Sequence, residues 1–247
     1  MEPEHRIYGG STDIDTDTVQ NLFNKRALAM GKDNPYTSVL LGDQNPEYAK
    51  EWNIFEKENI LPRLKLSGTS SFLDIGCGLG RWAESVIPLC GYYCGVDFSS
   101  EMINAARKRV CFADKKYDFI NCSFQDIGGR LAGKKFDRIV VSYICMYIND
   151  GDMEKCFENL RALAEPHGII YFTETVAVKE RLTLKDFYSS AMKTDYSTIY
   201  RTAEEYMKFY EKYLLAPGSK TESGFHPHLN REKEYSETDR WYMFIER

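Results

Sequence analysis

The sequence predicts an α/β protein with a doubly wound, mostly parallel sheet. Between residues 71 and 173, short apolar stretches alternate with stretches of helical periodicity, the pattern of parallel strands joined by helices. The first apolar stretch runs into glycines at alternate positions, in Phe-Leu-Asp-Ile-Gly-Cys-Gly-Leu-Gly at 72–80. A glycine turn between strand and helix lets a ligand approach the backbone and the free N–H groups of the helix. We therefore expect a ligand in this turn.

The core elements follow in chain order. Short apolar stretches predict strands, and amphipathic stretches between them predict helices. Ser99 or Ser100 supplies an N-cap for the helix after the second strand. The predicted strands are 71–75, 92–96, 118–123, 138–142 and 169–173, and the predicted helices are 81–89, about 100–110 and 152–164, with a turn at 165–168.

The flanks of this core differ in character. Residues 1–15 are polar and predict a mobile arm, and two helices are expected after it, from about Asp17 to a break at Asn34-Pro35 and from Pro46 to Leu61. Residues 179–200 show no regular periodicity. Thr202 and Glu205 form a capping box that predicts a helix to about Tyr213, and a strand closes the chain at 241–245.

Composition narrows the class of protein. The 247 residues are 43% hydrophobic and 28% charged, with a net charge of −5 and no long basic run, which argues against nucleic acid as a partner. No apolar stretch is long enough to span a membrane, and the polar N-terminal residues are not expected to act as a signal peptide. The seven cysteines include no C-x-x-C pair, so free thiols in a cytoplasmic protein are expected, rather than disulfides or a zinc site.

The spacing of the glycine turn separates two kinds of nucleotide site. A dinucleotide fold has G-x-G-x-x-G, whereas this chain has Asp74-x-Gly76-x-Gly78-x-Gly80. The run resembles motif I of the class I S-adenosylmethionine (SAM) methyltransferases, D/E-x-G-x-G-x-G, and the resemblance covers about residues 72–172. It implies a seven-stranded Rossmann-like fold whose last strand is antiparallel, in a hairpin placed at about 213–222 and 240–246. It also implies an N-terminal arm and helical lid at 1–65, and a SAM-binding core at 66–247 with an acceptor-binding insert at about 179–202.

The resemblance implies S-adenosyl-L-methionine as cofactor and S-adenosyl-L-homocysteine as product. Asp97 ends the second strand, where the family's acid binds both ribose hydroxyls; taken alone, it could be a helix N-cap. The glycines and the Ser142 backbone would contact the methionine part, and residues just past the third strand would meet the adenine. The predicted cofactor residues are Arg26, Tyr36, Asp74, Gly76, Gly78, Gly80, Arg81, Asp97, Phe98, Met102, Ser123, Phe124, Gln125 and Ser142.

Several of these residues have an ordinary alternative. Arg81 either pairs with the methionine carboxylate or is a solvated arginine in the first helical turn. Phe98 and Met102 either pack on the adenine or belong to the core. Tyr36 either lies against the sulfonium or adenine or packs within the lid.

Tyr147, Glu174 and His226 are the predicted catalytic residues. Tyr147 follows the fourth strand, where small-molecule members carry a substrate-facing His or Tyr; core packing is the alternative. Glu174 ends the fifth strand at the rim where open α/β sheets bind ligands, as a base, a substrate contact or a charge facing water. His226-Pro227-His228 favours a loop near the pocket mouth over a metal site, and one of its histidines could be a base.

The segment after the fifth strand is rich in tyrosine and cations. In this fold, such inserts commonly cover the acceptor pocket, and Tyr with Arg suits a phosphate- or carboxylate-bearing acceptor. Each residue alone could equally be a surface residue. The predicted substrate-binding residues are Arg181, Lys185, Tyr196, Tyr200 and Arg201.

The acceptor class is inferred from what is absent and from a second resemblance. No Asn/Asp-Pro-Pro-Tyr/Phe, no Pro-Cys and no acidic metal cluster is present, which disfavours methylation of adenine N6, cytosine C5 and catechols. The Asn34-Pro35-Tyr36 and Tyr200-Arg201-Thr202 elements resemble bacterial methyltransferases of surface-polysaccharide biosynthesis.

The expected function is a SAM-dependent methyltransferase that needs no metal. Since the sulfonium leaves readily, alignment of the reactants is the enzyme's main task. The acceptor would be an oxygen, less readily a nitrogen, of a small polar metabolite such as a nucleotide-linked sugar or its phosphorylated or phosphoramidate substituent. The protein is expected to be a monomer or homodimer. The alternatives are a protein or peptide N-methyltransferase and a non-catalytic SAM-binding protein.

Overall fold

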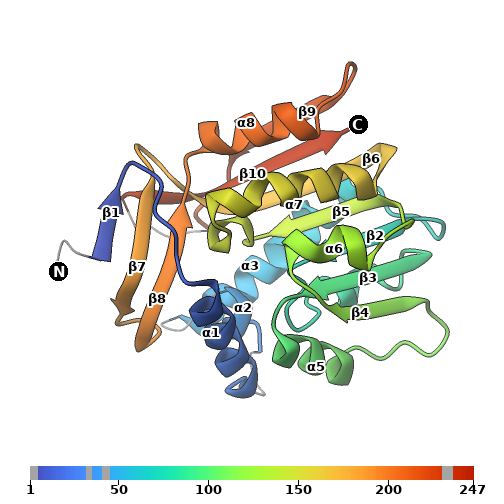
Figure 1. Ribbon diagram of the computed structural model, residues 1–247. Helices are drawn as coiled ribbons and strands as arrows, with labels where there is room; N and C mark the ends of the chain where they lie inside the picture. The colour runs from blue at the N-terminus through green and yellow to red at the C-terminus, as the bar shows by residue number, and fades with distance from the viewer. Residues whose placement is uncertain (1–4, 32–34, 41–44, 230–235) are drawn as a thin grey trace.

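A seven-stranded sheet of order β4-β3-β2-β5-β6-β10-β9 forms the centre of the molecule (Figure 1). The computed structural model describes residues 5–31, 35–40, 45–229 and 236–247. Six of these strands run in one direction, and β10 is antiparallel to both of its neighbours, β6 and β9, which confirms the predicted fold class. The strands are β2 (Ser71–Ile75), β3 (Tyr92–Asp97), β4 (Tyr117–Asn121), β5 (Phe136–Ser142), β6 (Ala164–Ala177), β9 (Lys220–Phe225) and β10 (Thr238–Glu246).

Helices cover both faces of this sheet. Apolar side chains of α6, α7 and α8 pack on one face, and those of α4, α5 and the end of α3 pack on the other. Within the described residues, no helix is both long and apolar enough to cross a bilayer. The helices are α4 (Ala83–Val86), α5 (Ser100–Arg109), α6 (Ile127–Arg130), α7 (Asp150–Leu163) and α8 (Ala203–Tyr213).

Local signals explain where several of these helices begin. The Ser99 side chain accepts a hydrogen bond from the Met102 N–H, and Thr202 and Glu205 make both bonds of the predicted capping box. The helix expected at 81–89 is much shorter, because Trp82 supplies no side-chain cap and Pro88 follows α4 closely.

The closing hairpin differs from the prediction at its first strand. β9 begins at Lys220, not 213, because α8 continues to Tyr213 and a turn follows it. The turn expected at 165–168 lies within the long strand β6, where His167 has a φ of 67°.

The N-terminal segment supplies helices beside the carboxyl ends of the strands. α1 (Thr16–Leu28) is capped by Asp15, and α3 (Pro46–Asn59) is capped by Asn45 with Pro46 in its first turn. α2 (Thr37–Leu40) lies between them. Asn34, the predicted break, lies outside the described residues.

A second sheet of order β1-β7-β8 stands beside the core (Figure 1). Its strands are β1 (Arg6–Tyr8), β7 (Leu182–Ser189) and β8 (Thr194–Tyr200). The prediction of a mobile arm is therefore wrong for residues 6–8, and the predicted insert is a hairpin. Neither segment shows an apolar pattern of its own. β1 is stabilised by a partner far away in the sequence, with Ile7 opposite Thr183 of β7, and β7 pairs in turn with β8.

Candidate functional site

A cavity of about 1700 Å³ lies at the carboxyl ends of the parallel strands and extends to the second sheet. The glycine turn after β2 and Asp97 at the end of β3 line one part of it. Side chains of β7 and β8 line another part. The predicted residues in its lining are Gly76, Gly78, Arg81, Asp97, Phe98, Met102, Ser123, Phe124, Gln125, Ser142, Tyr147, Tyr196, Tyr200 and His226.

The glycine turn depends on the absence of side chains. Gly76 has a φ of 75°, and a Cβ atom there would lie 1.9 Å from Ile144 Cδ1. Gly80 has a φ of 81°, and its Cβ would lie 2.9 Å from Val110 Cγ2. Gly80 is not in the cavity lining; it lets the turn pack against the end of α5.

Asp97 is bound to the glycine turn. Its two carboxylate oxygens accept hydrogen bonds from the Gly78 N–H at 2.9 Å and the Ser99 N–H at 2.8 Å. Burial raises the pKa of Asp97 to about 6. Because each carboxylate oxygen has two lone pairs, one acceptor site on each remains for a ligand hydroxyl. A carboxylate beside a turn without side chains fits a ribose joined to a group lying on the backbone.

The apolar residues expected near the adenine lie in the same cavity. Phe98 and Met102 line it, and Met102 is also buried in the core with Leu79. Ser123 donates to Asp126 at 2.6 Å, which fixes the turn after β4.

Three predicted cofactor residues make protein contacts outside the lining. Asp74 is buried and accepts the Tyr93 O–H at 2.7 Å, and burial raises the pKa of Asp74 to about 7. Tyr36 donates to Glu84 at 2.7 Å, and Arg26 donates to backbone carbonyls of α2. The Tyr36–Glu84 contact joins the helical segment to the core.

Arg81 reaches the cavity but already has an ion-pair partner. It lies 2.6 Å from Glu56 of α3, a side chain with no solvent exposure. The solvated alternative for Arg81 is therefore wrong, since only 5% of the residue is exposed.

Tyr147 and Tyr196 form a buried hydroxyl pair at the second sheet. Their oxygens are 3.0 Å apart, and burial raises the pKa of Tyr147 well above its ordinary value. Phe23 of α1 packs edge-on against Tyr147. Both tyrosines therefore present neutral hydroxyl groups to the cavity.

Glu174 lies beneath the turn that carries Tyr147, outside the cavity lining. Its Oε1 accepts hydrogen bonds from the Ile144 and Cys145 N–H groups at 3.1 and 2.8 Å. The side chain is fully buried, so the alternative of a rim charge facing water is wrong. Burial raises the pKa of Glu174 to about 7.

His226 is a buried histidine in the cavity wall. Its Nε2 lies 3.1 Å from Thr173 Oγ1, and Trp52 contacts the imidazole edge-on. Burial lowers the pKa of His226 to about 4, so the ring is neutral at physiological pH. The structure describes no group of three His, Cys, Asp or Glu side chains arranged as metal ligands.

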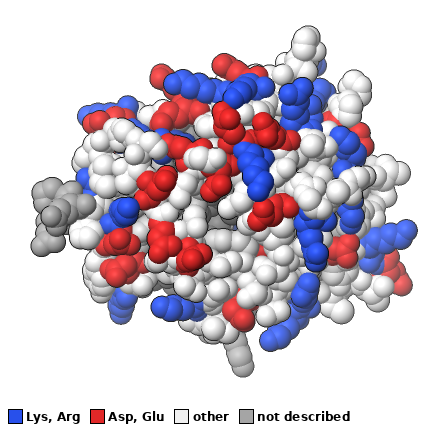
Figure 2. All heavy atoms as spheres, in the orientation of Figure 1, with Lys and Arg blue, Asp and Glu red and all other residues white. Residues whose placement is uncertain are grey.

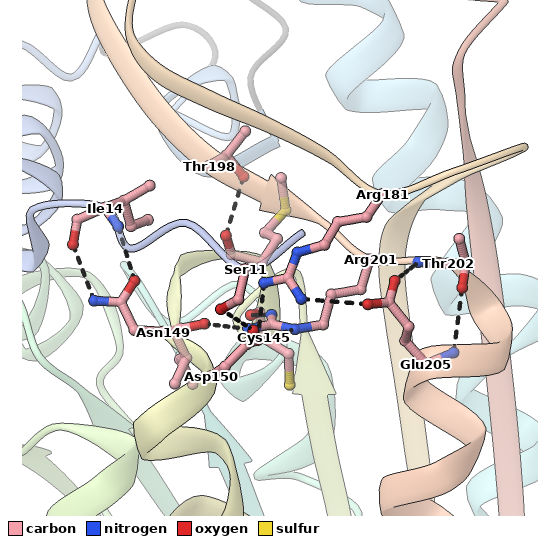
Figure 3. Close-up of polar contacts among 12 residues, drawn as sticks. Ser11, Ile14, Cys145, Asn149, Asp150, Arg181, Thr198, Arg201, Thr202 and Glu205 are labelled. Atoms are coloured by element: carbon pink, nitrogen blue, oxygen red, sulfur yellow. Dashed lines mark hydrogen bonds and ion pairs between the residues drawn. The ribbon is translucent and has the colours of Figure 1, made fainter. Parts of the chain in front are cut away.

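The predicted substrate cations lie away from the cavity lining. Asp150 accepts hydrogen bonds from Arg181 at 2.8 Å, Arg201 at 2.6 Å and the Ser11 hydroxyl at 2.6 Å (Figure 3). We call these four residues the Asp150 cluster. Arg201 also donates to the carbonyls of residues 145 and 148, on either side of Tyr147. Arg181 and Arg201 were expected to face the acceptor. Instead, both are structural residues that bind Asp150. Lys185 is also outside the lining.

Charge is unevenly distributed around this region. Figure 2 shows acidic side chains gathered over the middle of the face drawn. Asp186 and Asp195 of the second sheet line the cavity. The carboxylates thus favour a cationic group near the second sheet.

Some lining residues were not predicted from the sequence. Arg240 of β10 and Tyr48 of α3 both line the cavity. Tyr143 has a φ of 57°, and its buried hydroxyl has no hydrogen-bond partner among the described residues. The sequence does set Arg240 apart, since it is the one cation in the apolar closing strand 240–245. The alternation of side chains along a strand, however, does not show which face of the strand lines a cavity.

The sheet topology, and the glycine turn beside Asp97, match the class I SAM methyltransferase fold. Residues 72–168 match the family model described as a methyltransferase domain. This segment is thus a methyltransferase domain.

Known proteins resemble the chain over different lengths. Nodulation protein S of Bradyrhizobium diazoefficiens is 28% identical over 123 residues, which are 48% of this chain and 57% of that protein. A SAM-dependent methyltransferase of Leishmania major superposes with a TM-score of 0.66 at 17% identity, covering 93% of this chain and 82% of the other. Phosphoethanolamine N-methyltransferase 1 of Haemonchus contortus, bound to phosphoethanolamine and S-adenosylhomocysteine, has a TM-score of 0.68 at 17% identity, covering 93% and 48%. The chain spans little more than half the length of the first curated relatives it matches.

Proposed function

We propose that this protein transfers a methyl group from SAM to an oxygen of a small polar acceptor that carries a phosphorylated group. A nucleotide-linked sugar, or its phosphorylated or phosphoramidate substituent, is the proposed acceptor, as in surface-polysaccharide biosynthesis. The observation that carries the proposal is a single cavity reaching from Asp97 to the tyrosines of the second sheet. The seven free cysteines suit the reducing cytoplasm, the proposed compartment.

The cofactor part of the cavity would bind SAM through the predicted residues. Asp97 would accept the ribose hydroxyls, and Gly76 and Gly78 would leave room for the methionine part. Bound SAM supplies an activated methyl group. The glycine turn and Asp97 would hold it in one orientation, and alignment of this kind is a large part of catalysis of a displacement.

The acceptor part would lie between Tyr147, Tyr196 and Tyr200. The buried, neutral hydroxyl groups of Tyr147 and Tyr196 suit hydrogen bonding to a polar acceptor better than proton abstraction, because burial disfavours their phenolates. His226 is proposed as the base that accepts the acceptor's proton, since its imidazole is neutral and lines the cavity. Glu174 is proposed to act indirectly, by holding the turn that carries Tyr147.

Methylation of an amine is the second candidate. Asp186 and Asp195 line the cavity near the second sheet and would attract a cationic amine. Phosphoethanolamine N-methyltransferases are among the relatives and structural neighbours. Such an acceptor would still be small, polar and phosphorylated.

Methyl transfer from labelled SAM to four groups of compounds tests the proposal. The groups are nucleotide sugars, phosphorylated alcohols, phosphorylated amines and peptides. We expect turnover of a phosphorylated alcohol or nucleotide sugar; turnover restricted to phosphorylated amines would select the second candidate. Labelling of peptides alone would support a peptide methyltransferase, and SAM binding without any turnover would support a non-catalytic protein. Either result would contradict the proposal.

A further inference from the structure

Three arginines and no lysine of the described residues line the cavity. Arg6 forms an ion pair with Glu237, and Arg81 pairs with Glu56. The Arg240 side chain makes no hydrogen bond and no ion pair with any residue that the structure describes. Arg240 is therefore the cavity arginine whose charge the described protein does not balance.

Two aromatic rings of α3 support the Arg240 guanidinium. Its Cζ lies 4.4 Å from the ring centroid of Trp52 and 4.5 Å from that of Tyr48. Trp52 is buried to 1% exposure, so this platform is held by the core. A guanidinium over aromatic rings keeps its N–H donors in its own plane, at the edge that the rings do not cover.

The neighbouring carboxylates are engaged elsewhere. Glu237 accepts from Arg6 and from the Tyr8 hydroxyl. Asp239 accepts the backbone N–H of Arg240 at 2.8 Å, and its other oxygen lies 3.7 Å from His228 Nε2. Burial lowers the pKa of Arg240 to about 10, which still leaves it charged at neutral pH. A cation removed from water without a counter-ion is costly, and an anionic ligand would offset that cost.

Strand pairing places Arg240 at the acceptor end of the sheet. It lies opposite Thr175 of β6, one residue beyond Glu174, and its carbonyl accepts the His226 N–H. Thr175, His226 and Arg240 all line the cavity. An anion bound here would therefore sit beside the histidine proposed as the base.

We infer that Arg240, held over the rings of Trp52 and Tyr48, binds the phosphoryl oxygens of the methyl acceptor. The inference rests on the proposed function and adds the residue that selects the acceptor. The guanidinium edge presents paired N–H donors that match two oxygens of a tetrahedral oxyanion. Acceptors without such a group would leave the Arg240 charge unpaired and would bind weakly.

Binding of inorganic phosphate to the protein loaded with S-adenosylhomocysteine tests the inference without turnover. In titration calorimetry, Arg240→Gln should weaken phosphate binding by roughly 10- to 100-fold relative to the wild type. Arg240→Lys keeps the charge but loses the planar pair of N–H donors, so it should weaken phosphate binding less than Arg240→Gln does. Acetate should bind more weakly than phosphate, which separates a phosphoryl site from a carboxylate site.

Arg63→Gln is the matched control. Arg63 also stacks on an aromatic ring, with Cζ 3.8 Å from the Phe244 centroid, but it pairs with Glu222 and does not line the cavity. This variant should bind phosphate as the wild type does. Unchanged phosphate affinity in both Arg240 variants, or no phosphate binding by the wild type, would overturn the inference. Loss of S-adenosylhomocysteine affinity in Arg240→Lys, with phosphate binding retained, would also overturn it, by placing Arg240 in the cofactor site.

Turnover separates this inference from the proposed function. If a phosphorylated acceptor is methylated and Arg240→Gln raises its KM by roughly 10-fold or more at unchanged SAM affinity, both stand. If that KM is unchanged, the inference fails and the function stands. If no phosphorylated compound is methylated, the function fails, and the phosphate titration alone decides whether Arg240 binds an oxyanion.

Discussion

The Asp97 carboxylate links the end of one strand to the turn after another. It accepts N–H groups from Gly78 and Ser99, so both its position and its orientation are set by backbone. Charge-assisted bonds of this kind are among the stronger hydrogen bonds in proteins. A ligand hydroxyl would thus meet an acceptor that needs little reorganisation.

Replacing Asp97 with Asn should weaken SAM and S-adenosylhomocysteine binding by roughly 10- to 100-fold, because the amide keeps the shape but loses the charge and one acceptor oxygen. Calorimetry with S-adenosylhomocysteine measures this. Asp118→Asn is the control, since this carboxylate is exposed and bonds Tyr92 away from the cavity. Equal affinities for the two variants would refute the ribose assignment of Asp97.

The second sheet is joined to the core by the Asp150 cluster. Arg181 precedes β7, Arg201 follows β8, and Ser11 precedes α1, so a single carboxylate binds both ends of the hairpin and the N-terminal segment (Figure 3). Arg201 is 1% exposed and also binds the turn around Tyr147. The cluster therefore holds Tyr147, Tyr196 and Tyr200 in position relative to the rest of the cavity.

Asp150→Asn should lower the free energy of unfolding by about 2–3 kcal/mol, because Arg201 would remain buried without a counter-charge. Urea unfolding measures this loss. S-adenosylhomocysteine affinity should change little, since the glycine turn and Asp97 are not in the cluster. Glu154→Gln, which removes an exposed pair with Lys212, should leave the free energy of unfolding almost unchanged. A similar small cost for Asp150→Asn would show that the cluster does not stabilise the fold.

Across the whole molecule, four buried carboxyl groups of the described residues have raised pKa values. The pKa of Glu56 is raised, those of Asp74 and Glu174 are raised to about 7, and that of Asp97 is raised to about 6. Burial is the leading cause in each case. A carboxyl group with a raised pKa in the folded state holds its proton more tightly there than in the unfolded chain. Its stabilising contribution is complete below the unfolded value, near 4, and is lost as pH rises through 6 to 7.

The free energy of unfolding of the ligand-free protein should therefore fall between about pH 4.5 and pH 7.5. His226, whose pKa burial lowers to about 4, contributes in the opposite direction up to its unfolded value near 6.5, so the fall is smaller than the carboxyl groups alone would give. Glu174→Gln should reduce this fall by up to about 3 kcal/mol, because the amide oxygen can still accept the N–H groups of residues 144 and 145 but does not titrate. Urea unfolding at a series of pH values measures the slope. Glu154→Gln should keep the wild-type slope. A Glu174→Gln slope equal to that of the wild type would mean that Glu174 is already ionised when folded.

The parallel core, and the glycine turn with Asp97 beside it, were predictable because their signals are local. Strand, glycine turn and terminal acid follow one another within residues 71–97, and each restricts the backbone or supplies a donor group whatever surrounds it. The caps at Ser99 and Thr202 are local for the same reason. The order of these elements was enough to predict the fold.

The acceptor side depends on contacts between distant segments, which no local pattern records. β1 pairs with a strand about 175 residues later along the chain. Arg181 and Arg201 have a structural role because the fold places Asp150 between them. The same tertiary packing places Arg240 over the rings of α3, with no carboxylate partner among the residues that the structure describes. An arginine's role depends on whether the fold brings it a counter-charge, and only the tertiary structure decides that.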